Sequence, residues 1–147
     1  MSELAQDHQL HKHSVMPSCL QLSLIANWFE MTKALIKKED YRELTPFWCN
    51  RFLLYDGKPK TVKWWSFMQN YEGCFFRKAI ESNIENGKIT FKHFDVNRMT
   101  LGYPKADDKS KVLDLEHKGI EIRTGNPEWG AEPNKLYFVI MHGAVLA

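Results

Sequence analysis

A charged cluster at residues 37–43 is the part of the sequence best suited to chemistry. It reads KKEDYRE and places six charged side chains shortly before Pro46. Lys37 is a compact cation that suits a phosphate, and Arg42 offers a planar fork of hydrogen-bond donors. Asp40, on the same strand face as Arg42, can orient that fork or accept a hydrogen bond from a base amine. The cluster therefore predicts either a nucleic-acid site or a solvated strand with weak surface ion pairs.

A strand and a helix are expected immediately before this cluster. Residues 18–25 alternate between apolar and polar side chains, which predicts a half-buried strand with its leucines inward. Residues 26–38 carry an apolar stripe at helical spacing, and Asn27 is the predicted N-cap of that helix. The stripe consists of Trp28, Met31 and Leu35. The cluster itself alternates, which puts Asp40 and Arg42 on one face of a second strand.

The rest of the chain is predicted to be helical first and then made of strands. Pro46 opens a short helix through Leu54, and a longer helical stripe follows the turn at residues 55–60. From residue 88 the period changes to two, and a phase shift across Lys118 and Gly119 predicts a bulge that bends the sheet. We expect an α+β fold in which a small β-barrel has helices packed at its rim.

Composition and known motifs limit the function classes. A chain of 147 residues with a net charge of +2 fits one domain and identifies no partner by charge alone. Residues 1–16 are polar and predict a flexible arm, whose three histidines are expected to be solvated and not to form a metal site. The three cysteines form no CxxC pair, and no apolar run suits a membrane span, so we expect a cytoplasmic protein without a membrane partner. No P-loop, GxGxxG, GxSxG or HExxH motif is present, and no cofactor is expected.

The stretch LSLIANWFEMTKALIKKEDYREL, together with the closing GNPEWGAEPNKLYFVIMHGAVL, resembles the ASCH domain of the PUA-like superfamily. It is most similar to the small ASCH-type proteins carried by bacteriophages. The family pattern GxKxxExR has its lysine at Lys37, its acidic or hydroxyl position at Asp40 and its arginine at Arg42, whereas Leu35 stands in the glycine position. Three of the four positions thus match in kind. The resemblance covers residues 19–51 and 94–147 of a domain expected to span 17–147, with 53–91 as a helical insertion.

Leu35 departs from the family pattern in a way that has a physical consequence. A glycine there can leave the helix with a positive φ, which leucine resists. We therefore expect the helix to run on or the turn to take another shape. The side chain of Leu35 is then expected to join the core beside Trp28 and Met31.

The resemblance implies a PUA-like β-barrel with a cleft between the sheet and the first helix, in which RNA or an extruded base is bound. It assigns Lys37, Asp40 and Arg42 to this cleft, with Tyr41 between them in sequence. Trp129 lies in a loop rich in glycine and proline at residues 125–135. It either covers the barrel end as packing or forms a wall of the cleft.

The segment at residues 53–91 offers a separate candidate surface. Its basic groups are interleaved with aromatics, which suits single-stranded nucleic acid, and the candidate contacts are Lys58, Lys60 and Trp65. An aromatic stripe at helical spacing is more often core, so most of these aromatics are expected to be buried. Trp65 and Phe76 lie off the stripe and are predicted to be exposed to a nucleic-acid or protein partner.

Three functions are compatible with these residues. The first is binding of RNA or DNA, including a modified or extruded base. The second is a small amidohydrolase or ribonuclease with Lys37 and Asp40 as catalytic groups, because some relatives act on acetylated cytidine or have been linked to RNA cleavage. In the amidohydrolases a threonine occupies the position of Asp40, and a carboxylate cannot directly replace a hydroxyl nucleophile. The third is a phage protein whose inserted aromatic helix binds and inhibits a host defence protein.

Overall fold

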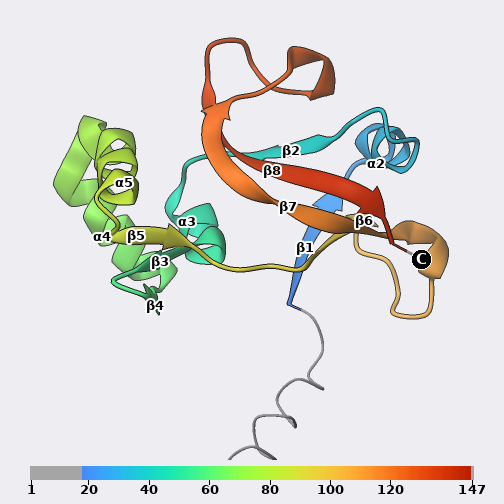
Figure 1. Cartoon of the computed structure of the whole chain (residues 1–147), viewed down its shortest axis with the longest axis horizontal. Coiled ribbons are helices and arrows are strands. Elements are labelled where there is room, and N and C mark those ends of the chain that lie inside the picture. The colour runs from blue at the N-terminus through green and yellow to red at the C-terminus, as the bar shows by residue number, and fades with distance from the viewer. Residues whose placement is uncertain (1–17, 147) are drawn as a thin grey trace, which may run out of the picture.

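A curled five-stranded sheet forms the centre of the fold (Figure 1). The computed structural model describes residues 18–146, so the predicted arm at 1–16 lies outside the described residues. Strand β1 pairs with β6 in parallel, and the other neighbours are antiparallel. The strand order is β1 (Cys19–Leu24), β6 (Val96–Leu101), β7 (Val112–Thr124), β8 (Leu136–Val145) and β2 (Glu39–Arg42). The described chain is thus a mixed α/β fold built on a half-barrel sheet with helices.

The curl comes from the two longest strands, β7 and β8. Their pairing shifts register between Leu115 and His117 and again between His117 and Gly119, and Gly119 has a φ of 124°. The predicted bulge is therefore confirmed, although β7 runs through it as one strand. A bulge adds a residue to one strand and increases the local twist, which bends the sheet towards closure.

Two short helices flank the site-bearing strand β2. Helix α2 (Ala26–Lys33) follows β1, and α3 (Pro46–Phe52) follows β2. The prediction that Asn27 caps α2 is wrong, because the helix begins at Ala26, two residues earlier than that cap requires, and its N-cap, Ile25, makes no side-chain hydrogen bond. In α3 the predicted Pro46 start is confirmed, and the Thr45 hydroxyl accepts a hydrogen bond from the Trp48 amide at 3.5 Å.

Helix α2 ends in a Schellman turn with leucine in the position that usually holds glycine. The Ile36 amide donates to the Met31 carbonyl at 2.9 Å, and the Leu35 amide donates to the Thr32 carbonyl at 3.0 Å. Leu35 has a φ of 62°, and its side chain is 52% exposed. The expectation that Leu35 would avoid this conformation and join the core is wrong. Both hydrogen bonds of the turn hold Leu35 in a conformation that costs a side chain with a Cβ roughly 1–2 kcal/mol.

We expect Leu35→Gly to stabilise the protein by about 1 kcal/mol, because glycine adopts a positive φ without a steric penalty. The gain is smaller than the full penalty because glycine also gives the unfolded chain more freedom. Urea denaturation of the wild type and the variant measures the difference. Ala34→Gly is the matched control, since Ala34 has a φ of −79° and should lose stability with the same kind of change.

Residues 53–91 form a second small sheet as well as helices. The strand order is β4 (Lys58–Pro59), β3 (Leu53–Tyr55) and β5 (Ile89–Phe91). Helix α4 (Val62–Glu72) and α5 (Phe76–Glu85) are joined by a short 3₁₀ turn, η1 (Gly73–Phe75). The prediction that α3 continues through Leu54 is wrong, because the helix ends at Phe52 and the chain enters β3.

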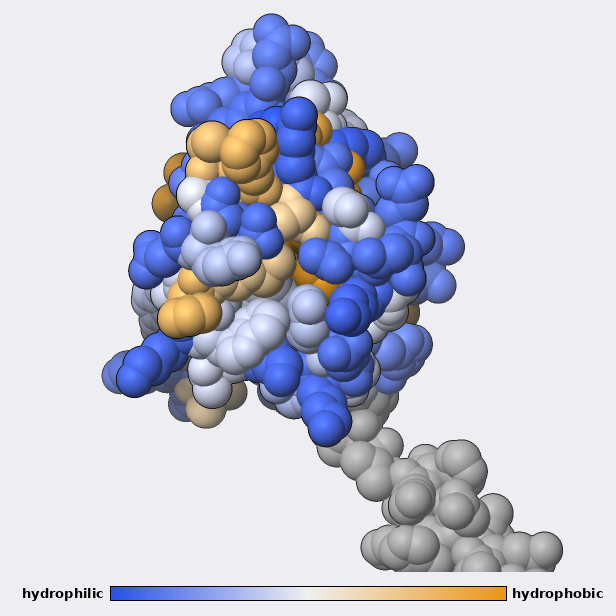
Figure 2. All heavy atoms as spheres, turned by 90° about the vertical axis from the view of Figure 1, so that its left-hand side faces the viewer, coloured by the Kyte–Doolittle hydropathy of each residue, from blue (hydrophilic) through white to orange (hydrophobic). Residues whose placement is uncertain are grey.

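The exposed aromatics of this segment differ from those predicted. Trp65 is fully buried and Phe76 is 5% exposed, so their predicted exposure is wrong, and Trp65 cannot stack on a base at the surface. The predicted stripe already fails within α4, where Tyr71 is 82% exposed, and the helix then breaks at Gly73, where φ is 61°. Phe67, Tyr71 and Phe75 are exposed instead. Figure 2 shows the side of the molecule on which α4 and α5 lie, with apolar groups at its surface. Binding of a host protein by this face stays a prediction.

Both sheets share one buried core. Leucines of β1, Trp65 of α4, Ile80 of α5 and Phe138 of β8 belong to the same apolar cluster. The remaining short elements are two 3₁₀ turns, η2 (Lys109–Lys111) and η3 (Pro127–Trp129). Within residues 18–146, none of the helices combines the length and apolar character needed to cross a membrane.

Candidate nucleic-acid pocket

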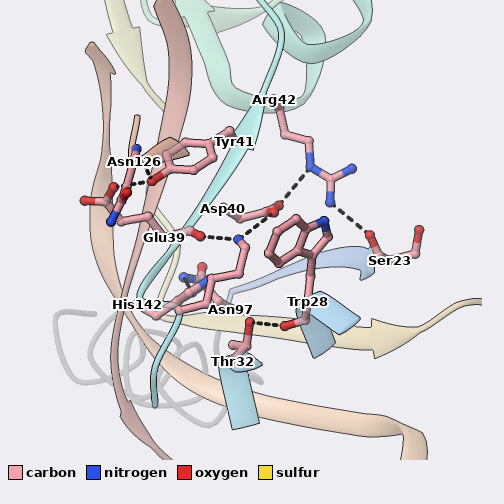
Figure 3. A network of polar contacts seen from close by, with 11 residues as sticks. Ser23, Trp28, Thr32, Glu39, Asp40, Tyr41, Arg42, Asn97, Asn126 and His142 are labelled. Atoms are coloured by element: carbon pink, nitrogen blue, oxygen red, sulfur yellow. Dashed lines mark hydrogen bonds and ion pairs between the residues drawn. The ribbon is translucent and has the colours of Figure 1, made fainter. Parts of the chain in front are cut away.

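A pocket of about 270 Å³ opens where β2, the end of β1, α2 and the β7–β8 loop meet. Its polar residues come mainly from β2 and the turn before it, and its aromatic walls come from α2 and the loop. Figure 3 shows Trp28 beside the side chains of Asp40 and Arg42. The predicted site residues that line the pocket are Lys37, Asp40, Tyr41, Arg42 and Trp129. The structure thus brings together the residues singled out on the cluster and on the distant loop.

Asp40 is the centre of a buried charged group in this pocket. Its side chain accepts a hydrogen bond from Arg42 Nε at 2.8 Å and from Lys37 Nζ at 3.5 Å. Arg42 Nη2 also donates to the backbone carbonyl of Ser23 at 2.9 Å, which ties β2 to β1. Since a guanidinium has five N–H donors, three of those on Arg42 are not used by these two bonds. Arg42 is therefore held in place and still has donors to offer a ligand.

Lys37 is the most deeply buried charged residue of the pocket, with 2% of its surface exposed. Burial lowers the pKa of its ammonium group, and the nearby Asp40 carboxylate opposes that shift. Its Nζ donates to the backbone carbonyl of Glu39 and lies 5.4 Å from the Tyr41 ring centroid and 5.8 Å from that of Trp28. At this depth Lys37 can meet a group that enters the pocket but not one that stays at the surface.

The β7–β8 loop that carries Trp129 is fastened to β2. The Tyr41 hydroxyl donates to Glu39 at 2.8 Å and accepts from the Asn126 amide at 2.9 Å. Although burial alone raises the pKa of Glu39, hydrogen bonds from Arg123 and Tyr41 lower it overall. A Cβ at Gly125 would lie 2.5 Å from the Tyr41 ring, so the absence of a side chain permits this close approach.

A buried polar chain beneath the pocket could not be found from the sequence. Asn97 on β6 is fully buried, accepts from His117 Nδ1 at 2.6 Å and donates to His142 Nδ1 at 2.8 Å. Because the amide nitrogen only donates, His142 carries its proton on Nε2, an atom that is buried without a hydrogen-bond partner among the described residues. Burial lowers the pKa of His142 to about 4. The one signal in the sequence is that Asn97 shares the buried face of its strand with Met99, two residues further on.

The other predicted contacts lie outside this pocket. Lys58 is exposed on β4, and Lys60 Nζ lies 5.1 Å from the ring centroid of Trp64 on α4. Neither lysine lines the pocket. The structure therefore separates Lys58, Lys60 and the buried Trp65 from the group around Asp40.

A second pocket of about 400 Å³ adjoins the first and shares Ser23 and Arg42 with it. It is lined in part by Trp48 and Arg51 of α3, neither of which was singled out from the sequence. Trp48 lies 4.8 Å from the Arg42 guanidinium and 5.6 Å from that of Arg51, measured to the ring centroid. Arg42 thus stands at the boundary between the two pockets.

Comparisons with known proteins add no assignment. The chain matches no family model, no curated protein and no solved structure. Across residues 18–146, no three His, Cys, Asp or Glu side chains gather in a way that could hold a metal ion.

Proposed function

We propose that this chain is a PUA-like ASCH protein that binds single-stranded nucleic acid by taking one extruded or modified base into the first pocket. The observation that carries the proposal is that Lys37, Asp40 and Arg42 line one pocket together with two indole side chains. As a phage-type protein, it acts in the cytoplasm of an infected host.

The size and polarity of the pocket suit a base. Its volume of about 270 Å³ lies just below the range of roughly 300–1,000 Å³ for small-molecule sites, which favours one planar ring system over a longer ligand. Trp28 and Trp129 offer aromatic surface for stacking, and Arg42 and Asp40 offer donors and acceptors for a base edge. A base that enters must leave its own stack, which costs least in a single strand.

We expect Trp129→Ala to weaken binding of a short single-stranded oligonucleotide about tenfold, because stacking of a base on an aromatic ring contributes roughly 1–3 kcal/mol. Fluorescence anisotropy with labelled RNA and DNA, each with and without one acetylated cytidine, measures this change at low salt. Arg42→Gln should weaken binding to a similar extent.

Two matched controls separate the pocket from general effects. Phe67→Ala removes an aromatic that is 73% exposed on α4, and Arg98→Gln removes an arginine that is paired with Asp114 on β7. Both variants should bind like the wild type. Absence of wild-type binding at low salt, or equal losses in the controls and the pocket variants, would refute the proposal.

A hydrolase is the second candidate, because Lys37 combines deep burial, a lowered pKa and a carboxylate neighbour, a combination common at catalytic sites. Such a lysine can act as a base once it is deprotonated. The same substrates are followed for deacetylation and for strand cleavage. Turnover that Lys37→Met abolishes would favour the enzyme, whereas binding without turnover at high protein concentration would leave the binding function alone.

A further inference from the structure

The second pocket has an excess of positive charge. Arg51 is half-buried, and its Nη2 donates to the Gln21 carbonyl at 2.9 Å. Among the described residues, Arg51 forms no ion pair with a carboxylate, and no acidic side chain lines the pocket. Burial and the neighbouring Arg42 both lower the pKa of Arg51. A partly buried cation with a second cation beside it and no acidic partner creates a strong preference for an anion.

A third cation, Lys92, lies close enough to Arg51 to affect it, although it does not line the second pocket. Lys92 donates from Nζ to the backbone carbonyl of Asn50 at 2.8 Å, and its pKa is lowered by burial and then by Arg51. Only Arg42 of the three has a carboxylate partner, Asp40, within the described residues. The local charge therefore remains positive after that ion pair is counted.

The rim of the second pocket is aromatic. Phe47 is 50% exposed and Tyr103 is 94% exposed, and both line the pocket. Trp48 is partly buried against Phe52, with ring centroids 5.4 Å apart and an interplanar angle of 18°. Because Trp48 also lies against both guanidinium groups, it holds them in position. The pocket thus combines fixed cations with accessible rings.

We propose that the second pocket binds the phosphodiester and the base that adjoin the extruded base on the same strand. The phosphate lies on the Arg51 fork, and the neighbouring base stacks against Phe47 and Tyr103. This inference rests on the proposed function, since the first pocket must hold a base for the second to hold its neighbour. The shared residues Ser23 and Arg42 make the two pockets contiguous, as consecutive nucleotides require. The ligand is then a strand of nucleic acid, not a free nucleoside.

Calorimetric titration of the wild type with a ligand series tests this inference. The probes are cytidine and acetylated cytidine, their 5′- and 3′-monophosphates, the corresponding dinucleotides, and inorganic phosphate alone. A phosphate on the correct side should raise the affinity about tenfold over the nucleoside, because a hydrogen bond to a charged group is worth roughly 1.5–3 kcal/mol. Dinucleotides should bind more tightly still. Equal affinities for all members of the series would refute the proposal that the second pocket binds a phosphate.

In the variant Arg51→Gln, the phosphate should no longer raise the affinity of a nucleotide above that of the nucleoside, and the affinity for the nucleoside should be unchanged. It should also reduce the slope of log affinity against log salt by about 0.7, the value for one contact to a single strand. Arg77→Gln makes the same charge change on α5, where Arg77 is paired with Glu81 outside both pockets, and should change neither quantity. If Arg51→Gln does not fold, the wild-type ligand series decides alone.

The two proposals fail in different ways. If a nucleoside binds but a phosphate adds no affinity, the proposal for the second pocket is wrong and the proposal for the first pocket stands. Phosphate binding that Arg51→Gln abolishes, without nucleoside binding, supports an anion site and overturns the proposed function. Tight binding of inorganic phosphate alone, with no further gain from a dinucleotide, identifies a free anion as the ligand and overturns the strand model.

Discussion

Replacing Asp40 with alanine should cost about 3–5 kcal/mol of unfolding free energy, because it leaves a buried charge without its partner. Lys37 is 2% exposed and Asp40 6% exposed, so the ion pair is mostly shielded from water. Arg42 loses its partner as well and keeps only the bond to the Ser23 carbonyl. Urea denaturation at neutral pH measures the loss.

Asp114→Ala is the matched control for this prediction. Asp114 accepts two hydrogen bonds from Arg98 at 2.8 Å each, but its side chain is 29% exposed, so we expect a loss of at most about 1 kcal/mol. The double variant Lys37→Met with Asp40→Leu should recover much of the loss, because it removes both buried charges. Equal losses for Asp40→Ala and Asp114→Ala would contradict the assignment of Asp40 as the centre of a buried charged group.

Acid should destabilise the protein through His142 by about 3 kcal/mol between pH 6.5 and pH 4. In the unfolded chain this histidine takes up a proton near its ordinary pKa of 6.5, whereas burial keeps it neutral in the native state down to about pH 4. The unfolded state therefore binds more protons in this window, and stability falls as the pH falls. The lowered pKa of His117, caused mainly by burial, acts in the same direction.

The variant His142→Asn isolates this contribution. Asparagine cannot titrate, and its side-chain oxygen can still accept the hydrogen bond from Asn97. We expect its stability to depend less on pH than that of the wild type by about 3 kcal/mol over the same window. Identical profiles for the wild type and His142→Asn would refute the prediction.

The periodicity of the sequence predicts those parts of the fold and of the site that depend only on residues close together in the chain. The alternation of Leu20, Leu22 and Leu24 predicts the buried face of β1, and all three are buried. The same period of two places Asp40 and Arg42 on one face of β2, where they pair with each other. The phase shift at Gly119 predicts the bulge of β7. In each case a local spacing rule fixes which way a side chain points.

Other features depend on contacts that local spacing does not contain. Asn97 and His142 are brought together only by the register of β6, β7 and β8, which is set by the whole sheet. Trp65 is predicted at the surface because the stripe through Trp64, Met68 and Tyr71 is read as the buried face, whereas the packing of α4 on the core turns Trp65 inward and leaves Tyr71 exposed. Leu35 is predicted in the core because leucine resists a positive φ and continues the stripe of Trp28 and Met31. The hydrogen bonds of the turn outweigh that strain, and the residue type alone does not reveal them.

The fastening of the β7–β8 loop to β2 has a thermodynamic consequence for any ligand of the first pocket. Because Tyr41 already holds the loop at Asn126, the wall that carries Trp129 stands in place before a ligand arrives. Binding then has no loop to order, so less of the contact energy is lost to conformational entropy. Cutting the tether with Tyr41→Phe should leave the contacts of the bound state almost unchanged. The free protein would change instead. Its loop would have to lose conformational entropy each time a ligand binds, which lowers the affinity.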